Sequence, residues 1–198
     1  MNSKRTGIVV LCLVIAILVG VASGLGVFLR GSGATSLAVS PRGEEFEMVT
    51  DGIYRFNSER MVAEGIGWDI ITLFVAVPIL LAALPALARG TLRGKLLTVG
   101  MLAYFFYQYL MYAMTWAFGP LFLLFILIYA LSAIGIFLIL SGIKLASLPQ
   151  SFSERFPARG MSIFSIVMAL LLVGMWLGRI VPALRGEIQG MLVGQTTM

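Results

Sequence analysis

The side chains best suited to chemistry form one polar stripe on a predicted helix. The stripe consists of Tyr104, Gln108, Tyr112 and Trp116. Residues four apart share one face of a helix. A glutamine amide held away from water needs a hydrogen-bond partner, and Tyr129 and Ser132 on the next apolar segment are suitable. The stripe therefore predicts either the wall of a solute pocket or ordinary hydrogen bonding between helices, and the second interpretation is simpler.

A second group of polar residues borders two uncharged runs. Asp69 directly precedes one run and Arg179 directly follows another, with Trp68 and Trp176 beside them. A carboxylate is favourable at a helix N-terminus, and an arginine near a helix end can extend toward lipid headgroups. These charges are either independent or paired in an outer-rim cluster that the polar stretch 31–67 covers.

Other catalytic groupings are missing from the sequence. It contains no histidine, and its single cysteine, Cys12, lies inside an apolar run. The segment Gly90-Thr-Leu-Arg-Gly-Lys95 lacks the full spacing and the Ser/Thr of a phosphate-binding loop. A basic turn close to the membrane, in contact with anionic lipid, explains it better. We therefore expect no catalytic residue, metal or cofactor.

The elements that would position these residues are membrane helices. Of the 198 residues, 60% are hydrophobic and 12% charged, and the mean hydropathy is +1.01. The stretch 96–143 carries no charge. As one helix it would span about 70 Å, more than twice the hydrocarbon core, so it must cross twice, with a break at Gly119-Pro120. This composition predicts a multi-pass helical membrane protein.

We expect an all-α bundle of about five transmembrane helices forming a single membrane domain over 1–198. The predicted helices cover about 6–29, 70–88, 96–118, 120–143 and 160–178, joined by linkers at 89–95 and 144–159. The extracytoplasmic loop 31–67 is expected to hold one short strand or hairpin around Thr50-Asp51-Gly52, indicated by Phe46 and Met48 and by Asp-Gly, which forms turns. Pro78 predicts a kink. The first segment reads as a retained helix, with a cleaved signal peptide as the alternative.

Basic residues predict the orientation. With the N-terminus in the cytoplasm, the inner segments hold eight Lys and Arg and the outer segments six. Arg89, Arg93 and Lys95 give the strongest bias, because short basic loops stay inside. Five spans then place the C-terminus outside the plasma membrane.

The chain resembles an uncharacterised family of prokaryotic multi-pass membrane proteins. The segments that carry the resemblance are Gly43-Glu-Glu-Phe-Glu-Met-Val49, Gly52-Ile-Tyr-Arg-Phe-Asn-Ser58, Trp68-Asp-Ile-Ile-Thr-Leu73, Pro78-Ile-Leu-Leu81, Arg89-Gly-Thr-Leu-Arg-Gly-Lys95, Tyr104-Phe-Phe-Tyr-Gln-Tyr109, Gly119-Pro-Leu-Phe-Leu123 and Gly178-Arg-Ile-Val-Pro182. The resemblance implies the fold and no activity. Similar proteins continue past a Thr-Thr pair into further helices, so this chain reads as a shortened member or an incomplete gene product.

Two functions remain open. The first is a non-enzymatic membrane protein whose outer loop and rim bind a partner or ligand, supported by the acidic loop. The second is a transporter or permease component for a neutral or lipid-like solute, supported by the polar stripe. We expect membrane lipid as a partner, other membrane proteins or further copies of the chain as additional ones, and no nucleic acid.

Overall fold

The structure is a computed structural model of the 198-residue chain. It describes residues 3–40, 43, 45–143, 148 and 156–185. The chain divides into two compact units. The first holds all the elements up to residue 143, and the second holds the last helix. Each unit is described by itself.

The described residues are mostly helical. The helices are α1 (Ser3–Phe28), α2 (Glu59–Ile71), η1 (Thr72–Ala76), α3 (Val77–Ala88), α4 (Leu92–Thr115), α5 (Phe122–Ser141) and α6 (Ala158–Leu184). The strands β1 (Thr35–Val39) and β2 (Glu45–Val49) form one antiparallel hairpin. With α2, η1 and α3 counted as one continuous rod, five helices in the described part of the chain are long and apolar enough to cross a membrane. This agrees with the helical bundle predicted from the sequence.

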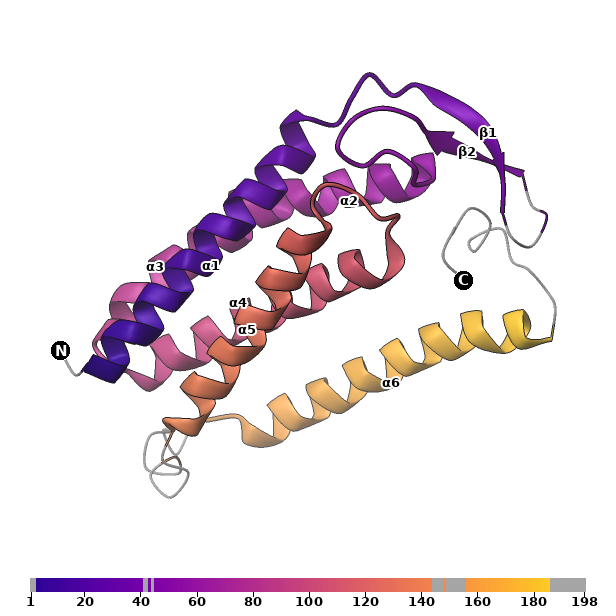
Figure 1. Cartoon of the computed structure of the whole chain (residues 1–198). Coiled ribbons are helices and arrows are strands. Elements are labelled where there is room, and N and C mark those ends of the chain that lie inside the picture. The colour runs from indigo at the N-terminus through magenta and orange to yellow at the C-terminus, as the bar shows by residue number, and fades with distance from the viewer. Residues whose placement is uncertain (1–2, 41–42, 44, 144–147, 149–155, 186–198) are drawn as a thin grey trace. The chain divides into compact units, whose positions relative to one another are not determined.

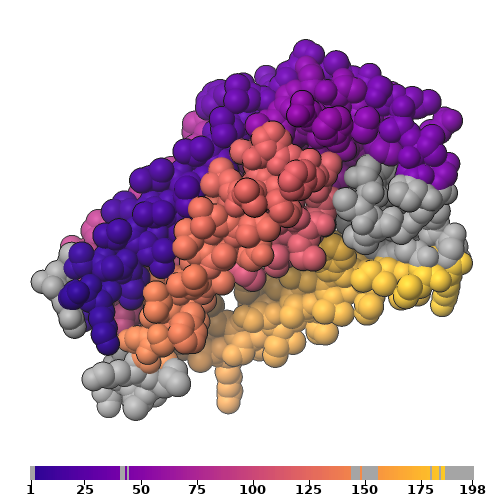
Figure 2. Space-filling view, in the orientation of Figure 1, coloured from indigo at the N-terminus to yellow at the C-terminus, as the bar shows by residue number. Residues whose placement is uncertain are grey.

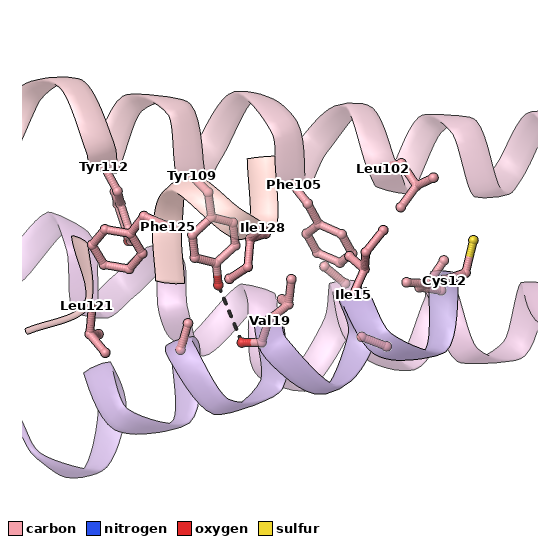
Figure 3. Close-up of a cluster of buried hydrophobic side chains, with 14 of the residues drawn as sticks. Cys12, Ile15, Val19, Leu102, Phe105, Tyr109, Tyr112, Leu121, Phe125 and Ile128 are labelled. Carbon is pink, nitrogen blue, oxygen red and sulfur yellow. Dashed lines mark hydrogen bonds between the residues drawn. The ribbon is translucent and has the colours of Figure 1, made fainter. Parts of the chain in front are cut away.

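Four rods make up the first unit (Figure 1): α1, the continuous α2–η1–α3, α4 and α5. α1 contacts α3 and α5, and α4 contacts the same two, so the rods close into a bundle. Figure 2 shows α1 and α5 lying side by side on one face. The interior is apolar and includes Ile15, Leu102, Phe105 and Ile128, which are fully buried (Figure 3).

The rod from α2 to α3 contains the proline that predicted a kink. Pro78 is the second residue of α3, and the five residues of η1 before it form a π-helical turn. The N–H of Val77 bonds to the carbonyl of Thr72, five residues back. A proline cannot donate an N–H to the preceding turn, and a wider turn is one local adjustment around such a position.

The start of this rod differs from the prediction. α2 begins at Glu59 rather than at residue 70. Ser58 has an extended backbone, and its side chain accepts a hydrogen bond from the N–H of Met61. This is an N-cap, which starts a helix irrespective of its hydrophobicity. The first turns of α2 are polar, so the uncharged run marked only the later part of the helix.

The predicted short strand carrying Phe46 and Met48 agrees with β2, but the hairpin lies elsewhere than around Thr50-Asp51-Gly52. β1 pairs with β2 in the register Thr35↔Val49 to Val39↔Glu45, and its turn falls between those strands. Asp51 and Gly52 instead follow β2. Gly52 has a φ of +77° and lies against the backbone of Arg30, where a Cβ would collide. The Asp-Gly pair therefore bends the chain back toward the end of α1 and does not form the hairpin turn.

Candidate functional site

The described residues of the first unit include one deeply buried carboxylate. Asp69 is 2% exposed and lies more than two turns inside α2. The prediction that Asp69 opens a helix was therefore wrong, because the helix starts at Glu59. A buried carboxylate must be hydrogen-bonded or paired to be tolerated. Its surroundings are hence the best candidate for a functional site.

Two tyrosine hydroxyls face this carboxylate. The Tyr54 hydroxyl donates to Oδ2 of Asp69 at 2.5 Å. The Tyr112 hydroxyl lies 3.4 Å from Oδ1 and 3.0 Å from the carbonyl oxygen of Gly65. Because a phenol has one proton, Tyr112 shares it between these acceptors, and the shorter bond to Gly65 is the stronger. Tyr54 is thus the principal donor to Asp69.

The Tyr54 hydroxyl is itself removed from water. Burial, followed by the nearby Asp69 carboxylate, raises the pKa of Tyr54 above its ordinary value. The phenol therefore keeps its proton and stays a hydrogen-bond donor. In the described part of the chain, no Lys or Arg forms an ion pair with Asp69. The ion pair found among these residues joins Arg60 and Glu64 on the surface. The partners of the Asp69 carboxyl group are thus tyrosine hydroxyls and no basic side chain of the described residues.

A glycine on α1 makes room for the carboxylate. A Cβ at Gly26 would collide with the Asp69 carboxylate and with the Tyr54 hydroxyl. Gly20 and Gly24 form a small-residue stripe with Ala16 in the sequence, yet a Cβ at either glycine would meet no atom within 4 Å. The close approach on α1 therefore occurs at Gly26 and not along that stripe. We call Gly26, Tyr54, Asp69 and Tyr112 the Asp69 site.

An aromatic cluster covers the Asp69 site. The Trp116 ring centroid lies 4.5 Å from those of both Tyr54 and Tyr112. A Cβ at Gly65 would collide with the Trp116 ring, so this glycine lets the indole pack on α2. Offset and edge-to-face rings of this kind contribute about 0.5–1.5 kcal/mol per pair beyond their burial. The cluster excludes water from the carboxylate and joins α2 to α4.

Asn57 ties the chain before α2 to the α4–α5 connection. It is 1% exposed, and its Nδ2 donates to the carbonyl of Tyr54 at 3.0 Å. Its Oδ1 accepts a 2.8 Å bond from the N–H of Ala117. A buried amide with both ends bonded fixes two segments relative to each other. Asn57 thus holds Tyr54 in position to reach Asp69.

A small cavity lies beside these groups. It is about 10 Å³ in volume, and Tyr54, Asn57, Tyr112 and Trp116 are among its lining residues. That volume is about one water molecule's worth. The cavity is much too small for a solute, so it does not form the pocket suggested by the polar stripe.

A second carboxylate fastens the segment that follows α1. Oδ2 of Asp51 accepts 2.6 Å bonds from both the N–H and the hydroxyl of Ser32. These two bonds hold the pKa of Asp51 below its ordinary value. The N–H of Ile53 also donates to the carbonyl of Leu29. Residues 29–58, which we call the cap, are therefore tied together internally by Asp51 and Ser32, and Tyr54 and Asn57 attach the cap to the bundle.

The predicted polar stripe is only partly brought together. Gln108 and Tyr112 are buried, and the Tyr104 hydroxyl lies 2.7 Å from that of Thr72. Trp116 lies beyond the last residue of α4 and has an extended backbone, so it leaves the helical stripe and turns onto Tyr54.

The partners predicted for Gln108 are not found in the structure. The Ser132 hydroxyl is buried without a hydrogen-bond partner among the described residues, so it does not bond Gln108. Tyr129 packs edge-on against Phe106, and the described hydrogen bonds include none between Tyr129 and Gln108.

The structure also does not bring all the residues of the predicted outer-rim cluster together. Trp68 is 47% exposed, whereas its neighbour Asp69 points into the bundle. Trp176 belongs to α6 in the second unit. The side chain of Arg179 lies outside the described residues, so the Asp69–Arg179 pair stays a prediction.

Sequence reasoning missed Tyr54, Gly26 and Asn57. Tyr54 is 15 residues from Asp69 along the chain and Ala117 is 60 from Asn57. No local pattern signals such pairs. The available signal was chemical, because an acid beside an apolar run needs donors and Tyr54 is a polar aromatic residue on the preceding loop.

Comparison of the chain with protein-family models, with curated proteins and with solved structures gave no match. What the Asp69 site can do therefore follows from its own geometry. Within the described residues there is no group of three or more His, Cys, Asp or Glu side chains that could hold a metal ion. The chemistry of the Asp69 site is that of a desolvated acceptor with donors from two segments, which joins the cap to the helices.

Proposed function

We propose that the protein is a non-enzymatic membrane protein whose cap binds an extended segment of another protein. The observation that carries this proposal is the open edge of β1, on a hairpin fixed to the helices through the Asp69 site. The resemblance to prokaryotic multi-pass membrane proteins supports the membrane part of the proposal. Membership of that family is proposed together with it.

The hydrogen-bond pattern of the β1–β2 ladder determines which backbone N–H and C=O groups of β1 point outward. The N–H of Thr50 donates to the carbonyl of Ala34, so these residues form a hydrogen-bonded pair. Such pairs alternate with non-hydrogen-bonded pairs in an antiparallel ladder. In the observed register, the N–H and C=O groups of Thr35, Leu37 and Val39 then point away from β2.

The two edges of the hairpin differ. Val49 on β2 exchanges hydrogen bonds with Asn57 and Phe56, at 2.9 and 2.7 Å, so this edge is partly occupied. Among the described residues, no backbone bond covers the outer edge of β1. Leu37 and Val39 are also 69% and 65% exposed. An uncovered edge strand with exposed aliphatic side chains is a template for adding a further strand.

Charge favours a basic partner segment. Glu47 lies opposite Leu37, and Glu45 lies opposite Val39, on one face of the hairpin. Both glutamates are exposed, and β1 itself carries no charge. Long basic side chains on an added strand would pack their stems on Leu37 and Val39 and extend toward these carboxylates. The proposed occupant is therefore an extended segment with alternating Lys or Arg.

The membrane placement is proposed with the cap outside the cytoplasm. It is supported by the basic α3–α4 turn with Arg89, Arg93 and Lys95, according to the positive-inside tendency. The five-span count then places the C-terminus outside as well. A reporter enzyme fused after Met198 should be active only outside the cytoplasm, and cytoplasmic activity would exclude this orientation.

A proline at Leu37 tests the binding mode. The Leu37 N–H points outward, so Leu37→Pro removes a donor from the open edge without removing a β1–β2 bond. A photo-crosslinking amino acid at Thr35 should capture one protein in native membranes. Leu37→Pro should reduce that product at least tenfold, whereas the control Leu37→Thr, which keeps the N–H, should retain most of it.

The crosslinked peptide identifies the partner. A peptide with alternating basic residues supports the proposal, and glutamine at both Glu45 and Glu47 should then weaken the product. An equal yield from Leu37→Pro and the parent chain, or crosslinks to lipid alone, would overturn it. Unchanged thermal unfolding of Leu37→Pro separates lost binding from lost folding.

The alternative function is a transporter or permease component for a neutral or lipid-like solute. It would need a cavity far larger than the one beside Trp116, which has room for about one water. No observation in the described residues favours it over binding at the cap.

A further inference from the structure

Basic residues gather at the end of the first unit opposite the cap. We call this group the basic corner: Lys4, Arg5, Arg89, Arg93 and Lys95. Figure 1 shows that the start of α1, the α3–α4 turn and the end of α5 all lie at this end. The corner thus combines charges from segments that are distant in sequence.

Two contacts hold parts of the corner in place. Gly90 has a φ of +78°, and a Cβ there would lie 2.7 Å from the guanidinium carbon of Arg5. Arg5 on α1 therefore lies directly across the α3–α4 turn. On the other side, the Lys95 ammonium donates to the carbonyl of Gly142 at 2.9 Å, just after α5. Arg89 and Arg93 flank the turn and are exposed.

The corner has no matching negative charge in the described part of the chain. Every Asp and Glu described there lies between Glu45 and Asp69, toward the cap end. Arg93 and Lys95 also occupy the first turn of α4, where a helix disfavours cations. Neither ion pairing nor helix stabilisation accounts for these bases. The positive-inside tendency favours their side of the membrane, and an external anion would supply the negative charge that the described residues do not.

Apolar surface begins where the charges end. Leu96 and Leu97, directly after Lys95, are 45% and 48% exposed. Val10, on α1 beyond Arg5, is 52% exposed. A free phosphate would contact only the charges, whereas a phospholipid provides a phosphate for the bases and acyl chains for the leucines.

We propose that the basic corner binds the headgroup of an anionic phospholipid. Arg5 and the two arginines that flank the α3–α4 turn hold the phosphate, and the acyl chains lie along the exposed start of α4. Guanidinium groups suit this role because they donate two parallel hydrogen bonds to phosphate oxygens. This site is separate from the cap, so it does not depend on the proposed partner binding.

Native mass spectrometry of the purified full chain tests the proposal. The detergent-solubilised protein is titrated with dioleoylphosphatidylglycerol and, separately, with dioleoylphosphatidylcholine. We expect the anionic lipid to bind at least tenfold more tightly. Each of Arg5→Gln, Arg89→Gln and Arg93→Gln should weaken the anionic lipid by about fivefold, from the typical attraction per basic residue.

The control variant is Arg55→Gln, which removes an exposed arginine from the cap end. It should leave the affinity for phosphatidylglycerol unchanged. Equal affinity for the two lipids, or an equal loss in Arg55→Gln and Arg93→Gln, would overturn the proposal. The last experiment is a competition with inorganic phosphate. If phosphate binds the lipid-free protein and displaces phosphatidylglycerol at equal concentration, the basic corner binds phosphate alone and the lipid proposal is wrong.

Discussion

The two halves of the bundle interior handle buried polar groups differently. In the half near the cap, the Asp69 carboxylate receives the Tyr54 hydroxyl and shares that of Tyr112. In the rest of the interior, the hydroxyls of Thr98 and Ser132 are buried without a hydrogen-bond partner among the described residues. A charge-bearing group left unpartnered is far more costly than a hydroxyl. The comparison indicates that side chains in the first half are positioned to hydrogen-bond Asp69. The second half buries the hydroxyls of Thr98 and Ser132 without such partners.

The largest expected effect comes from filling the space that Asp69 occupies. Gly26→Ala places a Cβ into the carboxylate and the Tyr54 hydroxyl, so one of them must move. We expect a loss of about 3 kcal/mol in the free energy of unfolding, the upper end for overpacking. Thermal unfolding in detergent measures it.

Gly24→Ala is the matched control, at the preceding glycine of α1. Its Cβ would meet no atom within 4 Å. Because alanine is a better helix former than glycine, this variant should be neutral or stabilised by up to about 1 kcal/mol. Equal losses in the two variants would show that α1 does not approach Asp69 closely.

Removing the principal donor should have the next largest effect. Tyr54→Phe keeps the ring on Trp116 but removes the 2.5 Å bond to Asp69. A buried acceptor left without its donor costs about 1–3 kcal/mol, so we expect a loss of about 2 kcal/mol in the free energy of unfolding. Hydrogen exchange at the Ala117 amide should also accelerate, since Asn57 and Tyr54 act together.

Tyr107→Phe is the control for Tyr54→Phe, because Tyr107 lies on α4 with 55% of its surface exposed. It should change neither stability nor exchange. If Asp69→Asn and Tyr54→Phe have additive effects in a double-mutant cycle, the two side chains are not coupled and the Asp69 site has been misassigned.

The helices were predictable from sequence because their signal is local. Uncharged runs marked the later part of the α2–α3 rod and all of α5. The start of α2 was missed because Glu59 and Glu64 make it polar, although Ser58 is a good N-cap. The hairpin turn was predicted at the wrong place because Asp51-Gly52 is the stronger turn signal in the sequence. This pair instead bends the chain next to the end of α1, where Asp51 bonds Ser32, 19 residues away.

The candidate site was much less predictable. Gln108 and Tyr112 were expected in the interior and are there. Asp69 was expected at a helix start, either as an independent interfacial charge or in a cluster covered by the stretch 31–67. Its full burial inside the bundle was not predicted, because it depends on Gly26 and Tyr54, which come from two other segments. Helical periodicity reports the face of one helix. It carries no information on which loop tyrosine reaches that face.

A smaller effect is expected at Asp51, the half-buried carboxylate that bonds Ser32 within the cap. The two Ser32 bonds lower the pKa of Asp51, so their stabilising effect is complete above the ordinary value of about 3.9 and is lost as pH falls through the lowered one. The Ser32 amide resonance should titrate with a midpoint below about 3.9. A midpoint at or above that value would contradict the assignment, and Asp51→Asn should abolish the titration.

The smallest effect should come from the two unpartnered hydroxyls, and it has the opposite sign from that at Asp69. Thr98→Val and Ser132→Ala each remove a buried oxygen that bonds to nothing in the described residues. Replacing such a group with an apolar one relieves desolvation, so we expect no loss and a gain of up to about 1 kcal/mol.

Ser23→Ala sharpens this test, because the Ser23 hydroxyl is equally buried but donates to the carbonyl of Val19 at 2.7 Å. Its loss should cost about 0.6 kcal/mol, the average for hydrogen bonds in membrane helices. Thermal unfolding of the three variants side by side measures the difference. If Ser132→Ala destabilises the protein as much as Ser23→Ala, the Ser132 hydroxyl has a partner in solution, and the two halves of the interior do not differ as proposed.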